Sequence, residues 1–137
     1  LEAINAFCER TGQEKPENDA QVIRLIFESL ALRYRQVLED LDRIATHPIE
    51  RLHIIGGGSK NRLLNQLTAN AIGRKVVAGP SEATAIGNVM IQAMAAGVVS
   101  SLQEMRSIIH ASVETEEFAP ELVAEWEEAY QKFVTLK

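Results

Sequence analysis

Apolar residues recur along the chain at spacings that predict mostly helices. The longest helix is expected from about Ala20 to Ile44, because apolar side chains three and four residues apart fall on one helical face. That face consists of Ile23, Phe27, Leu30, Tyr34, Val37, Leu41 and Ile44. The apolar region is widened by Leu25, Ile26, Leu32 and Leu38. A stripe of this width predicts burial against more than one neighbour.

The remaining pattern alternates short strands with helices. Apolar runs predict strands at 52–55 and 76–78, and glycine follows each of them. Helices are predicted at 1–11, from Ser59 or Lys60 to Ile72, at 82–96, from Ser101 to about 111, and from Pro120 through Phe133. Helix caps are expected at Asp19, Ser81 and Ser101, and helix stops at Gly73 and Gly97. Strands that alternate with helices are typical of an α/β fold.

Composition and charge exclude several classes of protein. The 137 residues suit one domain, or part of a larger protein, and the first residue is Leu1 rather than Met, which predicts a piece of a longer chain. The net charge of −5 and the lack of a basic run argue against a nucleic-acid surface. No apolar run reaches the ~20 residues of a membrane span. Cys8 is the single cysteine, so no internal disulfide is expected, and a cytoplasmic location fits.

A run of three glycines, in the segment "LHIIGGGSKNRLLNQL", carries the main chemical signal. A strand, a glycine turn and a helix start together place several backbone N–H groups beside the positive end of a helix dipole. Absent side chains let a ligand approach the main chain. This arrangement predicts a phosphate or nucleotide site, although an ordinary tight turn explains the spacing equally well.

The glycine run is a poor match to two well-known nucleotide-binding loops. A Walker loop needs lysine and then serine or threonine directly after its last glycine, whereas Gly58 is followed by Ser59 and Lys60 in the reverse order. A dinucleotide fingerprint would need glycine where Asn61 stands and an acidic residue ~20 positions later. The remaining polar residues show no nucleophile with a general base and no metal-ligand spacing, so we predict no catalytic or metal-binding residue in this chain.

The chain resembles the carboxyl-terminal half of the FGGY carbohydrate kinases. The resemblance lies chiefly in "IIGGGSKNRLLNQLTANAIGRKVVAGPSEATAIGNVMIQAMAAG", with "IFESLALRYRQVLEDL" before it and "FAPELVAEWEEAYQKF" after it. Within the family, "GPSEATAIGN" and "ESLALRYR" are similar to the branch that phosphorylates L-rhamnulose. The resemblance implies that residues 1–137 are the second, ribonuclease H-like (actin-like) domain of a two-domain sugar kinase whose amino-terminal domain is absent.

The same resemblance implies a reaction and a set of binding residues. The reaction is transfer of the γ-phosphoryl group of Mg²⁺-bound ATP to the 1-hydroxyl of a ketose. Relatives contact the nucleotide through the middle glycine of the run and through an asparagine four residues later, which correspond to Gly57 and Asn61, with Gly56 and Gly58 shaping the turn. The catalytic base and most metal and sugar ligands would lie in the absent half.

Three functional hypotheses remain open from the sequence. The first is the nucleotide-binding half of a ketose kinase, for L-rhamnulose or for L-fuculose or xylulose. The second is a stand-alone Rossmann-type nucleotide-binding module, and the third is a helical interaction domain with an incidental glycine turn. Binding of ADP, of NAD or of neither separates the three.

Overall fold

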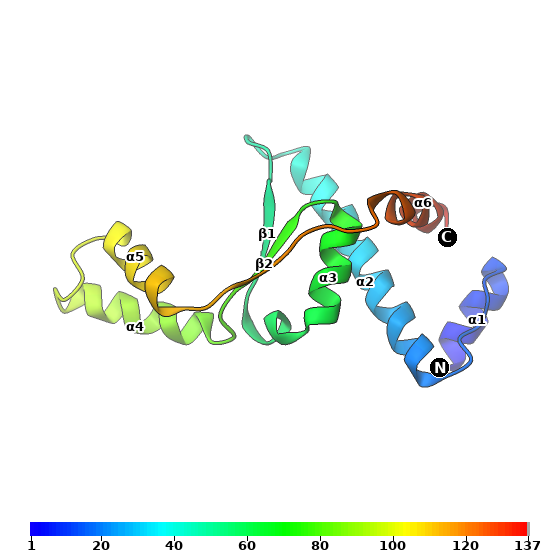
Figure 1. Ribbon diagram of the computed structural model, residues 1–137, viewed down its shortest axis with the longest axis horizontal. Helices are drawn as coiled ribbons and strands as arrows, with labels where there is room; N and C mark the ends of the chain where they lie inside the picture. Colours follow the sequence, from blue (N-terminus) through cyan, green and yellow to red (C-terminus); the bar gives the residue numbers. More distant parts are fainter. Residues whose placement is uncertain (137) are drawn as a thin grey trace.

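The computed structural model describes residues 1–136, and it contains helices around a small sheet (Figure 1). The helices are α1 (Glu2–Thr11), α2 (Asp19–Asp42), α3 (Arg62–Ile72), α4 (Ala83–Ala95), α5 (Leu102–Ser112) and α6 (Val123–Thr135), with a short 3₁₀ helix, η1 (Gly56–Lys60). The strands are β1 (Arg51–Ile54), β2 (Lys75–Ala78) and β3 (Glu116–Phe118). The predicted α/β pattern is confirmed, and β3 is an addition that sequence analysis did not assign.

The sheet is mixed, and β2 is its central strand. β1 pairs with β2 in parallel, with Leu52 opposite Val76, and β3 pairs antiparallel with β2, with Phe118 opposite Val76. Between β2 and β3 the chain makes the α4–α5 excursion, which lies away from the rest of the molecule on the left of Figure 1. β3 therefore returns the chain to the sheet before α6 begins.

Two apolar clusters join α2, α3, α6 and the sheet. The first contains Ala31, Leu32, Leu67, Ala71, Trp126 and Tyr130, with Phe27 and Phe133 against it. The second contains Leu38, Ala69, Ile72, Val76, Ala78 and Phe118, with Ile49, Leu52 and Ile54 against it. α3 contributes to both clusters, so it links the sheet to α2 and α6. Trp126 and Tyr130 form the inward face of α6, with Phe133 beside them.

Two of the three predicted helix caps, Asp19 and Ser81, differ in the structure. The cap of α2 is Asn18, whose Oδ1 accepts from the Gln21 N–H at 3.0 Å, and Asp19 is the first helical residue instead of the cap. α4 follows Glu82 rather than Ser81, and no side chain of the described residues caps it. The predicted cap of α5, Ser101, is confirmed, because its Oγ accepts from the Glu104 N–H at 3.1 Å.

The last helix begins at Val123, three residues after the predicted start at Pro120. Side chains of α3 bind the backbone of the preceding segment. Gln66 Nε2 donates to the Ala119 carbonyl at 2.8 Å, and Asn70 Oδ1 accepts from the Glu121 N–H at 2.9 Å. Because these bonds fix the backbone on either side of Pro120, helical geometry is delayed until Val123.

The predicted burial of the long stripe on α2 is wrong for most of its members. The residues of α2 that are buried are Ala31, Leu32 and Leu38. Most of the predicted stripe stays exposed, including Leu30 at 38%, Val37 at 42% and Leu41 at 45%. The helix therefore turns a neighbouring face toward α3 and leaves an apolar face exposed.

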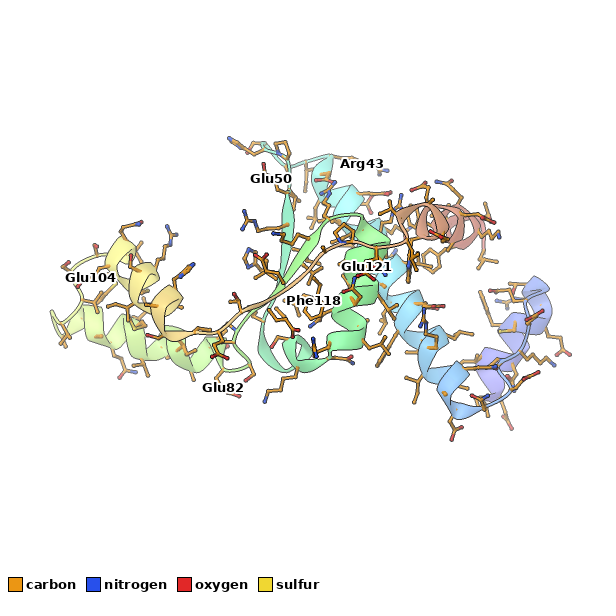
Figure 2. All side chains as sticks on the ribbon, viewed as in Figure 1. Arg43, Glu50, Glu82, Glu104, Phe118 and Glu121 are labelled. Atoms are coloured by element: carbon orange, nitrogen blue, oxygen red, sulfur yellow. The ribbon has the colours of Figure 1, made fainter. Side chains whose placement is uncertain are left out.

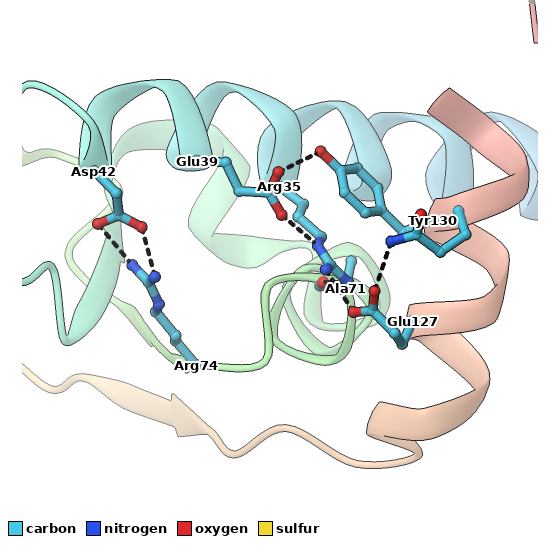
Figure 3. A network of polar contacts seen from close by, with 8 residues as sticks. Arg35, Glu39, Asp42, Ala71, Arg74, Glu127 and Tyr130 are labelled. Carbon is cyan, nitrogen blue, oxygen red and sulfur yellow. Dashed lines mark hydrogen bonds and ion pairs between the residues drawn. The ribbon is translucent and has the colours of Figure 1, made fainter. Parts of the chain in front are cut away.

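A polar network fastens α2 to α3 and α6 (Figure 3). Arg35 lies at its centre, with Nε 3.0 Å from Glu39 and a terminal nitrogen 2.5 Å from Glu127. The guanidinium carbon stands 3.9 Å from the centre of the Tyr130 ring, and the Tyr130 hydroxyl donates to Glu39 at 2.7 Å. Burial, followed by this hydrogen bond, raises the pKa of Tyr130 to about 12. The network fixes how α6 lies on the other two helices.

A second ion pair connects the end of α2 to the start of β2. Arg74 binds both carboxylate oxygens of Asp42, at 3.1 and 2.5 Å, and also donates to the Ile49 carbonyl at 2.7 Å. This two-point contact holds the pKa of Asp42 below its usual value. The pair thus ties the segment before β1 to the strand beside it.

We expect Tyr130→Phe to lower the free energy of unfolding by about 1 kcal/mol, because it removes the hydrogen bond to Glu39 and keeps the ring. Urea denaturation measures the change. Tyr34→Phe is the matched control, since the Tyr34 hydroxyl has no hydrogen-bond partner within residues 1–136 and its side chain is exposed. An equal loss in both variants would contradict the role of the network.

Acid should remove the contribution of the Asp42–Arg74 pair. A carboxyl group whose pKa is lowered on folding stabilises the fold above its unfolded pKa, which is about 4, and this stabilisation is lost as the pH falls. We therefore expect the Asp42→Asn variant to unfold at a lower urea concentration than the parent protein at pH 7. The difference between the two midpoints should shrink at pH 3. Asp40→Asn is the control, because its pair with Arg43 is exposed. A pH-independent difference would rule out this linkage.

Candidate functional site

The glycine run forms a 3₁₀ turn between β1 and α3. Gly56 adopts a φ of 76°, in the left-handed region that favours glycine, and the turn runs from Gly56 to Lys60. Ser59 is buried, and its Oγ donates to the Gly56 carbonyl at 2.8 Å. The Asn61 N–H donates to the Gly58 carbonyl at 3.1 Å. α3 begins only at Arg62, so the predicted helix start at Ser59 or Lys60 lies inside the turn.

Two main-chain hydrogen bonds tie this turn to the end of β2. The Gly79 N–H donates to the Ile54 carbonyl at 2.8 Å, and the Gly56 N–H donates to the Pro80 carbonyl at 3.0 Å. A Cβ atom on Gly79 would stand 3.2 Å from a methyl carbon of Ile55, which is a tight contact. The carboxyl ends of two parallel strands are thus held together, and in open α/β sheets ligands bind at such ends.

Gly57 presents bare main chain to the surroundings. It is exposed, and a Cβ atom built on it would meet nothing within 4 Å. A Cβ atom on Gly58 would meet only the Ile54 side chain, at 3.7 Å. The first N–H groups of a helical turn lack partners inside the turn. A ligand group can therefore reach the Gly57 N–H without displacing a side chain.

Asn61 lies at the junction of the turn and α3. Its Oδ1 accepts from the Leu64 N–H at 3.1 Å and so caps α3. Within residues 1–136 its amide nitrogen has no acceptor. The structure thus uses the amide oxygen for the helix and leaves its two N–H donors for a ligand.

Asn65, in α3, supports the turn, and sequence analysis did not predict this role. Its side chain is fully buried, and its Nδ2 donates to the Ser59 carbonyl at 2.9 Å. Its Oδ1 has no partner within the part of the chain that the structure describes. A polar residue inside the apolar stretch "RLLNQL" was the signal that could have indicated this role.

A groove of about 730 Å³ lies next to the turn. Ser59 and Lys60 form part of its wall, and the rest comes from residues 78–82, Ile86 and residues 112–116. Three lining carboxylates belong to Glu82, Glu114 and Glu116, and Lys60 is the one lining lysine or arginine within residues 1–136. Figure 2 shows Glu82 where α4 leaves the sheet. The groove therefore suits hydrogen-bond donors better than several phosphate groups.

The described residues contain neither a metal-ligand group nor a membrane-spanning helix. Residues 1–136 contain no group of three histidine, cysteine or acidic side chains arranged to hold a metal ion. Across the same residues, no helix is both long and apolar enough to cross a bilayer. The site therefore offers main-chain donors, an amide and a groove as its binding groups.

A family model and the known proteins most similar to this chain in the comparisons below point to the same family. The model of the "FGGY family of carbohydrate kinases, C-terminal domain" matches residues 2–96. A rhamnulokinase from Bacteroides thetaiotaomicron is 58% identical over 132 residues, which cover 96% of this chain and 27% of that protein. A rhamnulokinase from Klebsiella pneumoniae subsp. pneumoniae is 45% identical over 117 residues, covering 85% of this chain and 24% of that protein. The chain thus spans about a quarter of the length of these relatives.

A solved structure gives the fold. The crystal structure of a xylulose kinase from Rhodospirillum rubrum matches with a TM-score of 0.71 and 23% identity, over 91% of this chain and 25% of that one. The helix-rich chain with its small mixed sheet fits the second domain of the actin-like ATPase fold. The fold class predicted from the sequence is confirmed.

We expect alanine at Gly56 and at Gly57 to affect stability differently. Gly56→Ala should cost about 1–2 kcal/mol, because the left-handed backbone strains any L side chain. Gly57→Ala should not destabilise, since its φ is ordinary and a methyl group meets open space. Thermal melting of the two variants gives the comparison. Equal destabilisation would mean that Gly57 is required for the fold itself.

Proposed function

Because the chain belongs to the FGGY family of carbohydrate kinases, we propose that residues 1–137 form the nucleotide-binding, carboxyl-terminal domain of an ATP-dependent ketose kinase. The observation that carries this proposal is the bare main chain at Gly57, held at the carboxyl ends of two parallel strands. A side chain would fill the space that a nucleotide needs to reach the turn.

In this proposal, each residue of the glycine turn has its own role in binding the nucleotide. Gly56 and Gly58 shape the turn, the Gly57 N–H donates to the nucleotide, and the free amide nitrogen of Asn61 donates beside it. The acidic groove next to Lys60 receives the nucleoside, whose ribose hydroxyls and base N–H groups are donors. When bound, ATP supplies the γ-phosphoryl group that is transferred to the sugar.

Magnesium and the sugar are assigned to the rest of the protein. The carboxylates near the turn form no three-ligand group within residues 1–136, so this chain does not fit a complete Mg²⁺ site. The kinase would bind Mg²⁺ through the nucleotide phosphates and through residues outside this chain, as in other phosphoryl-transfer enzymes. We assign the catalytic base and the sugar site to the same outside part, and no residue here is proposed as catalytic.

We propose L-rhamnulose as the sugar and L-rhamnulose 1-phosphate as the product. Support comes from the relatives named rhamnulokinase, at up to 58% identity over nearly the whole chain. The xylulose kinase is 23% identical and supports the fold alone, so xylulose and L-fuculose stay as alternative sugars. The buried, free thiol of Cys8 agrees with a reducing, cytoplasmic location.

We expect Gly57→Ala to weaken ADP binding of the full-length protein about tenfold or more, because the added methyl group blocks access to the turn. Isothermal titration measures the affinity. Gly87→Ala, in α4, is the matched control, since a methyl group there also meets open space and φ is ordinary. Unchanged affinity in Gly57→Ala would refute the proposed contact.

Asn61→Ser separates the two roles of Asn61. Serine retains a helix cap and removes the amide nitrogen, so the fold should persist while the KM for ATP rises about 2- to 10-fold, the equivalent of one hydrogen bond. The KM for the ketose should stay unchanged. Steady-state kinetics over a panel of ketoses measures both values and identifies the preferred sugar. Binding of NAD in place of ADP would support a Rossmann-type module instead.

A further inference from the structure

Asn65 is a fully buried polar residue in the first half of α3. It is covered because α3 lies between α2 and the sheet (Figure 1). Its Nδ2 donates to the Ser59 carbonyl at 2.9 Å, and its Oδ1 has no partner within residues 1–136. A buried hydrogen bond stabilises a fold, whereas a buried acceptor without a partner destabilises it. Stability alone therefore gives little reason for an asparagine at this position.

The Asn65 side chain acts at the break between η1 and α3. Asn61 stands at that break, with a φ of −88° and a ψ of 83°, so the two helices are not continuous. In a continuous helix, the Ser59 carbonyl would accept from a main-chain N–H three or four residues later. The break interrupts this pattern, and the amide of Asn65 supplies the donor instead. The amide thereby fixes the end of the glycine turn.

Asn65 is bonded to both parts of the proposed nucleotide site. Through its side chain it holds Ser59, whose Oγ in turn donates to the Gly56 carbonyl at 2.8 Å. Through its main-chain N–H it donates to the Asn61 carbonyl at 3.0 Å. The Gly57 N–H belongs to the first part and the Asn61 amide nitrogen to the second. One buried residue thus connects the two groups that are assigned to the nucleotide.

We propose that Asn65 is a positioning residue for the nucleotide. Its amide holds the Ser59 carbonyl so that the Gly57 N–H and the Asn61 amide nitrogen serve the same ligand. Asn65 acts through the turn, because its side chain is buried and does not reach the surface. This inference rests on the proposed function and adds to it a residue that does not contact the nucleotide.

Loss of the amide should weaken nucleotide binding without blocking the site. A turn that is no longer held samples several arrangements, and the apparent affinity falls with the fraction that can bind. The sugar site is assigned to the part of the protein outside this chain, so the affinity for the sugar should not change. The two affinities therefore distinguish positioning of the turn from a general loss of structure.

Steady-state kinetics of the full-length protein tests the proposal. Asn65→Leu removes the amide and keeps the branched shape of the side chain, whereas Asn65→Ala removes the amide and leaves a cavity. We expect both variants to raise the KM for ATP about 2- to 10-fold, the equivalent of one hydrogen bond, with kcat and the KM for the ketose unchanged. A rise in only one of the two variants would follow side-chain size rather than the lost donor, and would overturn the proposal.

Thr68→Val is the matched control. Thr68 is also fully buried in α3, but its hydroxyl donates to the Leu64 carbonyl of the same helix rather than to the turn. Valine keeps the shape of the side chain and removes that hydrogen bond, so the KM for ATP should stay at the parent value. An equal rise in Thr68→Val and Asn65→Leu would mean that any disturbance of α3 weakens binding, which contradicts a specific role for Asn65.

Hydrogen exchange without nucleotide separates this proposal from the proposed function. Peptides that cover residues 56–61 should exchange at least about threefold faster in Asn65→Leu than in the parent, because the turn opens more often. An unchanged rate would overturn the positioning role, whether or not the protein binds ATP. Titration of the parent with ADP tests the proposed function by itself, since a parent that binds no ADP would refute that function. Failure of both Asn65 variants to fold would also overturn the proposal, because the residue would then be required for the fold.

Discussion

The pairing of β1 with β2, continued by the Gly79 and Gly56 N–H groups, is the constraint on which the rest depends. These bonds place the ends of both parallel strands side by side, so the glycine turn and the Gly79-Pro80 turn form one edge. α3 leaves that edge with Asn61 as its cap, and buried Asn65 holds the turn against the helix. Without this pairing, the bare main chain at Gly57 would have no fixed position.

One flank of α2 packs closely on α3 and α6, whereas its other flank is exposed within the described residues. Apolar packing and the Arg35 network hold α2, α3 and α6 together, and the Asp42–Arg74 pair holds the segment before β1. The opposite flank of α2 and the edge of β1 are left uncovered. The chain thus combines apolar clusters that position the glycine turn with an apolar helix flank that stays exposed within the described residues.

The sequence correctly predicted the parts of the fold that depend on residues close together along the chain. The periodic helices, the two apolar strands, the stop at Gly73 and the cap at Ser101 agree with the structure. Other features depended on contacts across the chain. β3 is a short, charged segment that becomes a strand only by pairing with β2, and α6 starts late because Gln66 and Asn70 hold the residues before it.

The sequence by itself determined the glycine turn, its place between a strand and a helix, and the family to which the chain belongs, because residue types and short spacings carry those features. Only the tertiary structure decided which flank of α2 is buried, that Gly57 combines an ordinary φ with open space, and that the oxygen of Asn61 serves the helix. The physical reason is that periodicity marks a face as apolar, whereas packing of distant segments decides what covers that face.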